Sequence, residues 1–233
     1  MIAGKKVLGL IPARGGSKGV VRKNLRLTGG KPLLVWTIEQ ALKSNYLDRL
    51  VLSSDDEEII AVGRANGCEA PFVRPPELAS DDTPAISVAL HALDTLTEQY
   101  DYLVLLQPTS PLRTTDDIDA AICRCVKQKA HSCVSVVEAE ETPYWMYVTS
   151  QNGELVPLLG TECRSPSRRQ DSPPVYVLNG AVYVAQTGWL RSTRVFVGPG
   201  TIPSIMQRSH SLDIDTEEDL RYFAFLLNER KSS

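Results

Sequence analysis

Residues 7–24, which read VLGLIPARGGSKGVVRKN, join a short apolar run to a loop rich in glycine and positive charge. The run 7–11 is short and apolar, which is typical of a buried strand. The loop after it has glycines at positions 15, 16 and 19. In an open α/β sheet, ligands bind beyond the carboxyl ends of the strands, which is where this loop would lie. This stretch therefore predicts an α/β sheet with a ligand site after its first strand.

Short apolar runs continue to alternate with helical periodicity through the first 140 residues. Alternation of this kind predicts a parallel sheet that is covered by helices on both faces. The predicted fold class is therefore α/β, with a doubly wound, mostly parallel sheet. The predicted strands are residues 7–11, 49–53, 70–73, 102–106 and 132–137, and the predicted helices begin near Leu34, Asp55 (as N-cap), Pro84 and Thr114 or Thr115.

Residues 138–174 interrupt this alternation. They contain an aromatic cluster (Tyr144, Trp145 and Tyr147), a hairpin turn at Asn152-Gly153 and a polar loop with several prolines. We interpret them as an arm inserted into a single domain that spans residues 1–233. Extended pieces are expected again over 175–184, 195–197 and 202–206, and Thr216 is expected to cap a final amphipathic helix.

The charges of the chain are distributed unevenly. Its 25 basic and 28 acidic residues give a net charge of −3, yet residues 1–38 hold eight Lys and Arg and no Asp or Glu. A mildly acidic chain is a poor general nucleic-acid binder. The local cationic block therefore points to a small anionic ligand and excludes nucleic acid as the main partner.

The five cysteines are odd in number and form no CxxC pair, and His residues do not cluster near them. This pattern favours free thiols over disulfides or structural zinc. No apolar run approaches the length of a membrane span. We therefore expect a cytoplasmic protein that has no membrane partner.

The glycine-rich loop can form a phosphate cradle. Glycines allow backbone N–H groups to approach phosphate oxygens, Arg14 offers a planar fork of donors, and Lys18 offers a point charge. Neither GxxxxGK[ST] nor GxGxxG with its acidic partner is present. Taken alone, the loop is equally compatible with an ordinary turn.

Asp213-Ile214-Asp215 lies directly before the predicted last helix. In extended chain the Cα atoms of residues two apart lie about 6–7 Å from each other on the same side, so both carboxylates can face one hard cation such as Mg²⁺. The alternative is an acidic helix start, where Asp and Thr are favoured in any case. For this pair alone, the helix start is the better interpretation.

Two further loops follow predicted strands. Residues 107–113, QPTSPLR, form a polar turn stiffened by prolines, in which Gln107 and Arg113 can point into the crevice at the strand ends. The same residues can also serve simply as the entry to the next helix. Residues 74–82 form a similar stiffened loop, and their composition alone indicates no more than that.

Five segments, taken together in their order and spacing, resemble the CMP-sialic acid synthetases, or acylneuraminate cytidylyltransferases. The resemblance implies a Rossmann-like nucleotidyltransferase fold and attack by the anomeric hydroxyl of a nonulosonic acid on the α-phosphate of CTP, which releases pyrophosphate. It also implies a homodimer in which an arm, here residues 138–174, reaches into the neighbouring active site. The segments are IPARGGSKG (11–19) with RKN (22–24), RPPELASDDTP (74–84), LLQPTSPLR (105–113), RRQDSPPVYVLNGAVYV (168–184) and SLDIDTEEDL (211–220).

The same resemblance assigns roles to individual residues. It implies catalytic roles for Arg14, Lys18, Asp213 and Asp215, and it implies Mg²⁺ as the cofactor, bound by Asp213 and Asp215. Nucleotide-binding residues would be Arg14, Gly15, Gly16, Ser17, Lys18, Asn24, Arg74, Asp82, Ala85 and Asn179. Sugar-binding residues would be Gln107, Thr109, Ser110, Trp145, Arg169, Tyr183 and Phe196.

Two departures from the family pattern concern the sugar. Trp145 stands where well-known sialic acid enzymes have Lys, and Val177 stands where they have Arg. Fewer cations and an added indole favour a less polar exocyclic tail, as in 9-deoxy diacetamido sugars of the legionaminic type. Three alternatives remain open: another sugar nucleotidyltransferase, a glycosyltransferase-like domain with a DxD motif, and a catalytically silent nucleotide-binding regulator.

Overall fold

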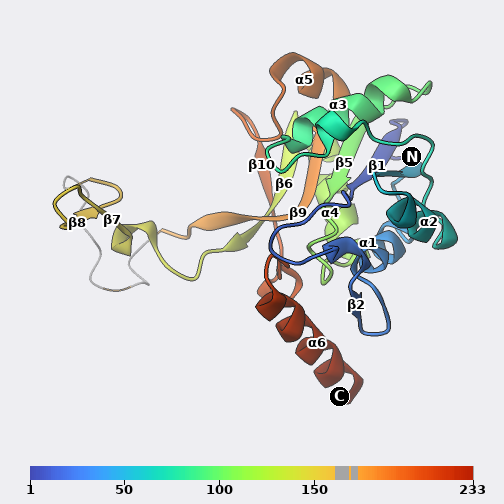
Figure 1. Cartoon of the computed structure of the whole chain (residues 1–233). Helices are drawn as coiled ribbons and strands as arrows, with labels where there is room; N and C mark the ends of the chain where they lie inside the picture. The colour runs from blue at the N-terminus through green and yellow to red at the C-terminus, as the bar shows by residue number, and fades with distance from the viewer. Residues whose placement is uncertain (161–167, 169–172, 233) are drawn as a thin grey trace.

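The computed structural model describes residues 1–160, 168 and 173–232, and its centre is a six-stranded sheet in the order β10-β6-β9-β5-β1-β4 (Figure 1). β9 runs antiparallel to its neighbours β5 and β6, while the other pairs in this sheet are parallel. The predicted doubly wound, mostly parallel sheet is therefore confirmed. Its strands are β1 (Val7–Pro12), β4 (Arg49–Ser53), β5 (Tyr102–Leu106), β6 (Ser132–Glu138), β9 (Tyr176–Gln186) and β10 (Ile202–Ile205).

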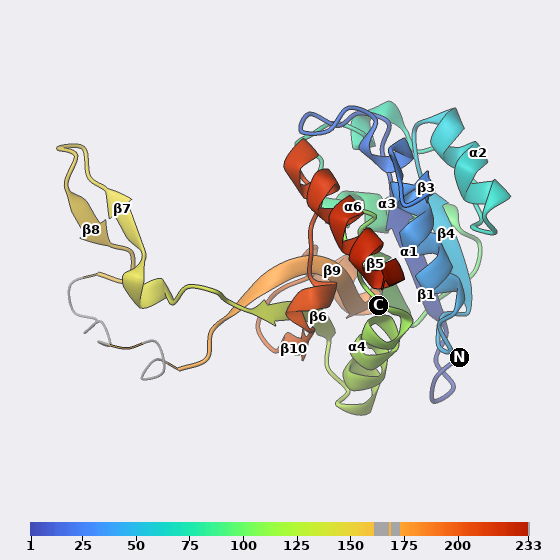
Figure 2. The ribbon, with the colours of Figure 1, turned by 90° about the horizontal axis from the view of Figure 1, so that it is seen from below.

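Helices cover both faces of this sheet (Figures 1 and 2). On one face, α1 (Leu33–Leu42), α2 (Glu57–Ala65) and α4 (Thr115–Lys127) share one apolar core with the strands. On the other, α3 (Ala85–Thr95) and α5 (Thr187–Thr193) form a second core. The strands β1 and β5 are almost wholly buried because they lie between these two layers.

The C-terminal helix α6 (Glu217–Ser232) packs against the start of α1 in a third apolar cluster. Phe223 is fully buried there and meets Trp36 edge-on, with ring centroids 5.3 Å apart. Thr216 and Asp219 cap the helix reciprocally, since each side chain accepts the backbone N–H of the other residue. This helix fixes the position of residues 213–215, which directly precede it.

The other helix starts follow the predicted chemistry, with one shift. Asp56, rather than Asp55, is the N-cap of α2, and its carboxylate accepts the N–H groups of Glu58 and Ile59. α4 begins with a capping box between Thr114 and Asp117. Asp55 is thereby left for a different role beside the glycine-rich loop.

Two predicted strands are absent from the structure. Residues 70–73 form no strand, and only a single bridge joins Val51 to Glu69, because Pro71 has no N–H to continue the ladder. Residues 195–197 are likewise irregular. Arg194, with φ 56°, ends α5 there, and a turn between Gly198 and Thr201 follows.

Between β6 and β9 the chain leaves the body of the molecule and forms a projecting hairpin (Figures 1 and 2). It holds a 3-10 turn, η3 (Pro143–Trp145), followed by β7 (Tyr147–Thr149) and β8 (Leu155–Pro157). The predicted turn at Asn152-Gly153 is confirmed, with Gly153 at φ +81°. The projecting segment and the strand ends at its base carry exposed apolar side chains, namely Trp145, Met146, Tyr147, Val148, Leu155, Val156, Leu158, Leu159, Tyr176, Val177 and Leu178.

The smaller elements complete the architecture. β2 (Leu27–Thr28) and β3 (Lys31–Pro32) form a short hairpin before α1. Among the residues that the structure describes there are three further 3-10 turns: η1 (Lys23–Leu25), η2 (Pro76–Leu78) and η5 (Arg208–His210). In the part of the chain that the structure covers, no helix is both long and apolar enough to cross a bilayer.

Candidate active site

A cavity of about 330 Å³ opens at the carboxyl ends of β1 and β5, where the fold class predicts a ligand site. Its wall is built from the loop after β1, the residues around η2 and the start of α3, the turn after β5, and the segment before α6. The predicted site residues that line it are Arg14, Gly16, Ser17, Asn24, Arg74, Ala85, Gln107, Thr109, Asp213 and Asp215.

The glycine-rich loop is held open over the cavity by side chains beneath it. Asn24, which is 7% exposed, donates from Nδ2 to the carbonyl oxygen of Arg14 at 2.9 Å. Its Oδ1 atom is buried without a hydrogen-bond partner among the described residues. The N–H of Gly15 donates to Oδ1 of Asp55 at 3.1 Å, and Gly16 has open space around it. Gly16 is thus the glycine in this loop whose backbone a ligand can approach freely.

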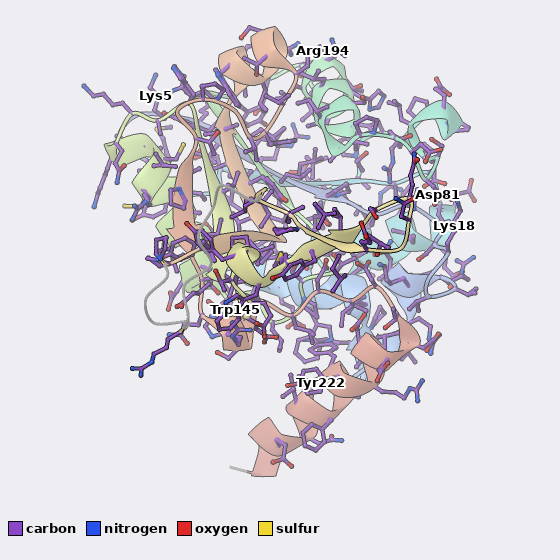
Figure 3. All side chains as sticks on the ribbon, turned by 90° about the vertical axis from the view of Figure 1, so that its left-hand side faces the viewer. Lys5, Lys18, Asp81, Trp145, Arg194 and Tyr222 are labelled. Carbon is purple, nitrogen blue, oxygen red and sulfur yellow. The ribbon has the colours of Figure 1, made fainter. Side chains whose placement is uncertain are left out.

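Arg14 and Lys18 share a carboxylate from the opposite wall. Oδ1 of Asp81 lies 2.5 Å from Nη2 of Arg14, and Oδ2 lies 2.7 Å from Nζ of Lys18. Figure 3 shows Lys18 and Asp81 together. The hydrogen bond from Lys18 and the charges of both cations hold the pKa of Asp81 below its usual range. The two cations predicted to bind phosphate are therefore already paired with one anionic side chain.

Arg74 approaches the cavity from inside the protein. It is 4% exposed, and its Nη2 donates to the carbonyl oxygen of Ser53 at 3.1 Å and lies 3.9 Å from Asp55. Burial lowers the pKa of Arg74, and the charge of Asp55 partly offsets this effect. Its Nε atom has no partner among the described residues. Arg74 and Ala85, the first residue of α3, both line the cavity.

Asp213 and Asp215 both line the cavity, although their spacing alone favoured a simple helix start. Loss of surrounding water raises the pKa of Asp213, and the negative charge of Asp215 raises it further. Lys23 approaches the same segment, with Nζ 3.0 Å from Oδ1 of Asp215 and 2.7 Å from the carbonyl oxygen of Ile214. The two carboxylates and the cationic loop therefore meet at one end of the cavity.

Gly19 brings the two parts of this end together. A Cβ atom at Gly19 would lie 2.1 Å from the carbonyl oxygen of Asp215, closer than any side chain allows. A glycine is therefore required where the loop crosses the segment before α6.

The turn after β5 forms the third part of the wall. The carbonyl oxygen of Thr109 accepts the N–H of Ile214 at 2.8 Å, which joins the turn to the aspartate segment. Gly180, at φ +73°, faces this turn. A Cβ atom there would lie 3.7 Å from Oε1 of Gln107 and 3.9 Å from Oδ2 of Asp213. The glycine leaves room beside the Gln107 amide.

The position of Arg113 in the sequence suggested that its side chain points into the crevice. In the structure it does not. It is 1% exposed and bonds to main-chain and hydroxyl oxygens inside the body. The turn reverses the chain through Ser110 to Arg113, which directs the guanidinium under the sheet end instead of toward solvent.

Four predicted residues lie behind the cavity wall. Asn179 is 7% exposed, and its amide is bonded to Ser135 and Ser211. The hydroxyl of Ser110 is buried without a partner among the described residues. Tyr183 is half-buried; burial raises its pKa, and the charge of Asp213 adds to this effect. Phe196 packs edge-on against Tyr183 in the core, so it supports that ring instead of lining the cavity.

The remaining predicted residues are outside this cavity or outside the described chain. Trp145 is 41% exposed and belongs to η3, on the segment that projects from the body. Gly15 and Asp82 flank lining residues without lining the cavity themselves. Lys18 reaches the site only through Asp81. Arg169 falls outside the described residues.

The cavity also contains residues to which the sequence had given no role. Lys23, Ser80, Asp81 and Thr83 all line it. The sequence analysis placed Lys23 in the cationic block of residues 1–38 and Asp81 in the stiffened loop 74–82. Their pairing with Asp215 and Arg14 depends on long-range contacts. The available signal was their position beside residues already assigned, since Lys23 precedes Asn24 and Asp81 precedes Asp82.

Comparison with known proteins adds independent findings. The family model for cytidylyltransferases matches residues 8–151. A pseudaminic acid cytidylyltransferase from Campylobacter jejuni is 35% identical over 95% of this chain and 96% of its own length. A CMP-N,N'-diacetyllegionaminic acid synthase from Legionella pneumophila is 34% identical over 92% of this chain and 93% of its own.

More distant proteins extend the comparison. An N-acylneuraminate cytidylyltransferase from Escherichia coli O18:K1:H7 is 31% identical over 97% of this chain, which spans 53% of that protein. Among solved structures, a CMP:2-keto-3-deoxy-manno-octonic acid synthetase complexed with CTP superposes with a TM-score of 0.72. The superposition covers 97% of this chain and 99% of the synthetase. The sequences are 15% identical, so the comparison shows a similar fold only.

Proposed function

The chain belongs to the cytidylyltransferase family, and from this premise we propose that it transfers CMP from CTP to a nonulosonic acid and releases pyrophosphate. One observation carries the proposal. Two carboxylates, Asp213 and Asp215, and the phosphate-type loop with Arg14 line the same cavity. Phosphoryl transfer needs this combination, because catalysis there consists mainly of positioning and charge screening.

The nucleotide would lie along the wall made by the glycine-rich loop and Arg74. Arg14 and Lys18 supply charge for the β- and γ-phosphates once they leave Asp81, and the open backbone at Gly16 admits a phosphate oxygen. Asn24 and Arg74 line this wall and would face the nucleoside. These groups leave the α-phosphate facing the aspartate end of the cavity.

The donor set at that end fits Mg²⁺. Among the described residues no cluster of three or more ligating side chains exists, and Asp213 makes no ion pair. Two carboxylates with open space suit an ion that keeps several waters and takes substrate phosphates as ligands. When bound, Mg²⁺ would neutralise charge on the reacting phosphates and polarise the attacking hydroxyl. Lys23 holds Asp215 in place from the other side.

The sugar acid would approach from the side of Gln107, Thr109 and Tyr183. Gln107 and Thr109 line the cavity there, and Tyr183 lies close enough to Asp213 to feel its charge. Trp145 could contact the sugar only from a second copy of the chain, because it lies on the projecting segment. We therefore propose a homodimer in which the exposed apolar residues of the segment pack against the partner.

We further propose a sugar with a less polar tail, of the legionaminic type. The observations are the exposed indole of Trp145 and the exposed Val177 at the base of the projecting segment, where cations would suit a more hydroxylated tail. The relative at 34% identity named for N,N'-diacetyllegionaminic acid supports this choice. Pseudaminic acid, named in the relative at 35% identity, is the second candidate.

The test is pyrophosphate release from CTP and Mg²⁺ with legionaminic, pseudaminic and N-acetylneuraminic acids, supplied separately under saturating CTP. We expect turnover with at least one of the three and the highest kcat/KM with the legionaminic type. A clear preference for N-acetylneuraminate would overturn the tail assignment. Turnover with none of them would overturn the proposed function.

The compartment we propose for this reaction is the cytoplasm. The four described cysteines are unpaired, and Cys68, Cys125 and Cys133 are buried as free thiols, which suits a reducing environment. Cys163 lies outside the described residues.

A further inference from the structure

The buried guanidinium of Arg113 is a feature that the proposed function does not explain. Arg113 is 1% exposed and has no carboxylate within ion-pair distance among the described residues. Burial lowers the pKa of Arg113 to about 9, so the group stays charged at neutral pH. The negative charge of Asp117 partly offsets this effect, but no carboxylate forms an ion pair with the guanidinium among the described residues, and a buried charge without an ion pair costs stability. The residue therefore calls for a reason other than stability.

Three segments of the fold meet at this side chain. Nη1 of Arg113 donates to the carbonyl oxygen of Gln107 at 3.0 Å and to that of Ala181 at 2.9 Å. Nη2 donates to Oγ1 of Thr37 in α1 at 2.7 Å. A planar fork with several fixed donors can serve three acceptors at once, which the single ammonium of Lys cannot do in the same geometry.

Two of these three contacts lead directly to the cavity. Gln107 lines it, and Ala181 follows Gly180, which faces both the Gln107 amide and Asp213. The same turn is tied to the aspartate segment through the carbonyl oxygen of Thr109. The third contact joins the guanidinium to Thr37 of α1, which is buried and does not line the cavity.

We propose that Arg113 is a positioning residue: by clamping the main chains of Gln107 and Ala181, it aligns the sugar-facing wall of the cavity with Asp213. The inference rests on the proposed function, because that function places the sugar acid on the Gln107 side. No hydrogen bond or ion pair within the described chain joins Arg113 to the nucleotide-facing residues Arg14, Asn24 and Arg74. Its effect is therefore directed at the sugar acid and leaves CTP affinity alone.

The first variant is Arg113→Lys, which keeps the charge and loses the fork. We expect the KM for the sugar acid to rise about 10- to 100-fold and kcat to fall, as small misplacements of reacting groups typically cause. The Kd for CTP, measured by calorimetry without the sugar acid, should stay unchanged. If this variant does not fold, Arg113→Met removes the buried charge and takes its place with the same expectation.

Thr37→Val is the matched control. It removes the contact to α1 and leaves both main-chain contacts, so we expect a lower urea midpoint with an unchanged KM for the sugar acid. A purely structural role predicts that activity in every variant follows the folded fraction, with sugar KM and CTP Kd changing together. That result, or an unchanged sugar KM in folded Arg113→Lys, would overturn the inference. Absence of turnover in the wild-type protein would instead overturn the proposed function.

Discussion

Arg14 lines the cavity and Arg113 lies buried behind it, and the two residues use the same guanidinium in opposite ways. Arg14 is partly exposed and pairs with a carboxylate, which a phosphate can replace because both are anions. Arg113 is buried and bonds to carbonyl oxygens, which no ligand replaces. One wall of the cavity is thus held by exchangeable contacts and the other by fixed ones. The nucleotide wall can change its partners, while the sugar wall is built in advance.

Asp213 and Asp215 lie where these two walls meet, so their loss should have the largest effect. Replacing either by Asn should lower kcat at least about 100-fold, because metal-assisted charge stabilisation contributes several kcal/mol. Glu218→Gln in the first turn of α6 removes the same charge from an exposed residue nearby and should leave kcat unchanged. Steady-state pyrophosphate release measures all three. Wild-type kcat in both Asn variants would remove the metal assignment.

Arg14→Ala tests the nucleotide wall, which is held by exchangeable contacts. A hydrogen bond to a charged group contributes about 1.5–3 kcal/mol, so the Kd for CTP should rise roughly 10- to 100-fold. The KM for the sugar acid at saturating CTP should change little, in contrast to Arg113→Lys. Calorimetry with CTP measures the Kd, and initial rates over a range of sugar acid concentrations measure the KM. If both walls respond equally to both variants, the division between them is wrong.

The ends of the parallel strands made much of this site predictable. Because β1 and β5 both end at one edge, residues after each strand had to converge there, and Arg14 and Gln107 did so. The two aspartates reach the same cavity from the segment before α6. The directions of individual side chains were not predictable. Arg113 turned inward because a proline-stiffened turn reversed the chain, which no local pattern distinguishes from an outward direction.

Long-range pairing explains the other differences. Asp81 forms ion pairs with Arg14 and Lys18. The amide of Asn179 is hydrogen-bonded to Ser135 within the sheet and is not presented to a ligand. Both contacts join residues far apart in the sequence, so they depend on the finished fold. The failed strand at 70–73 is different, because Pro71 was a local signal that the apolar character of the segment masked.

A smaller effect is expected from Asp81→Asn, which frees both cations before the nucleotide arrives. The Kd for CTP should fall about 3- to 10-fold, since exposed ion pairs are weak and their loss leaves both cations available to the nucleotide. Glu77→Gln, in η2 on the same loop, is the charge-matched control and should leave the Kd unchanged. Equal or weaker CTP binding by Asp81→Asn would show that Asp81 does not compete with the nucleotide.

The difference in CTP affinity between Asp81→Asn and the wild-type protein has a defined dependence on pH. The pKa of Asp81 lies below its usual range, so the ion pairs persist through the ordinary titration range of aspartate and are lost only as the pH falls through the lowered value. The advantage of Asp81→Asn should therefore be constant between pH 6 and pH 8. Titrations of CTP binding at several pH values within that range measure it, and an advantage that shrinks toward pH 6 would contradict the assignment.

The smallest effects concern one glycine on each wall. Gly180 is at φ +73°, so Gly180→Ala should lower the free energy of unfolding by about 1–2 kcal/mol, the cost of a left-handed non-glycine residue. Gly16 has open space and no positive φ, so Gly16→Ala should leave stability equal or slightly higher and weaken CTP binding by crowding the phosphate approach. Urea unfolding with CTP calorimetry measures both variants. A stability loss at Gly16 equal to that at Gly180 would mean that the nucleotide wall is as rigidly built as the sugar wall.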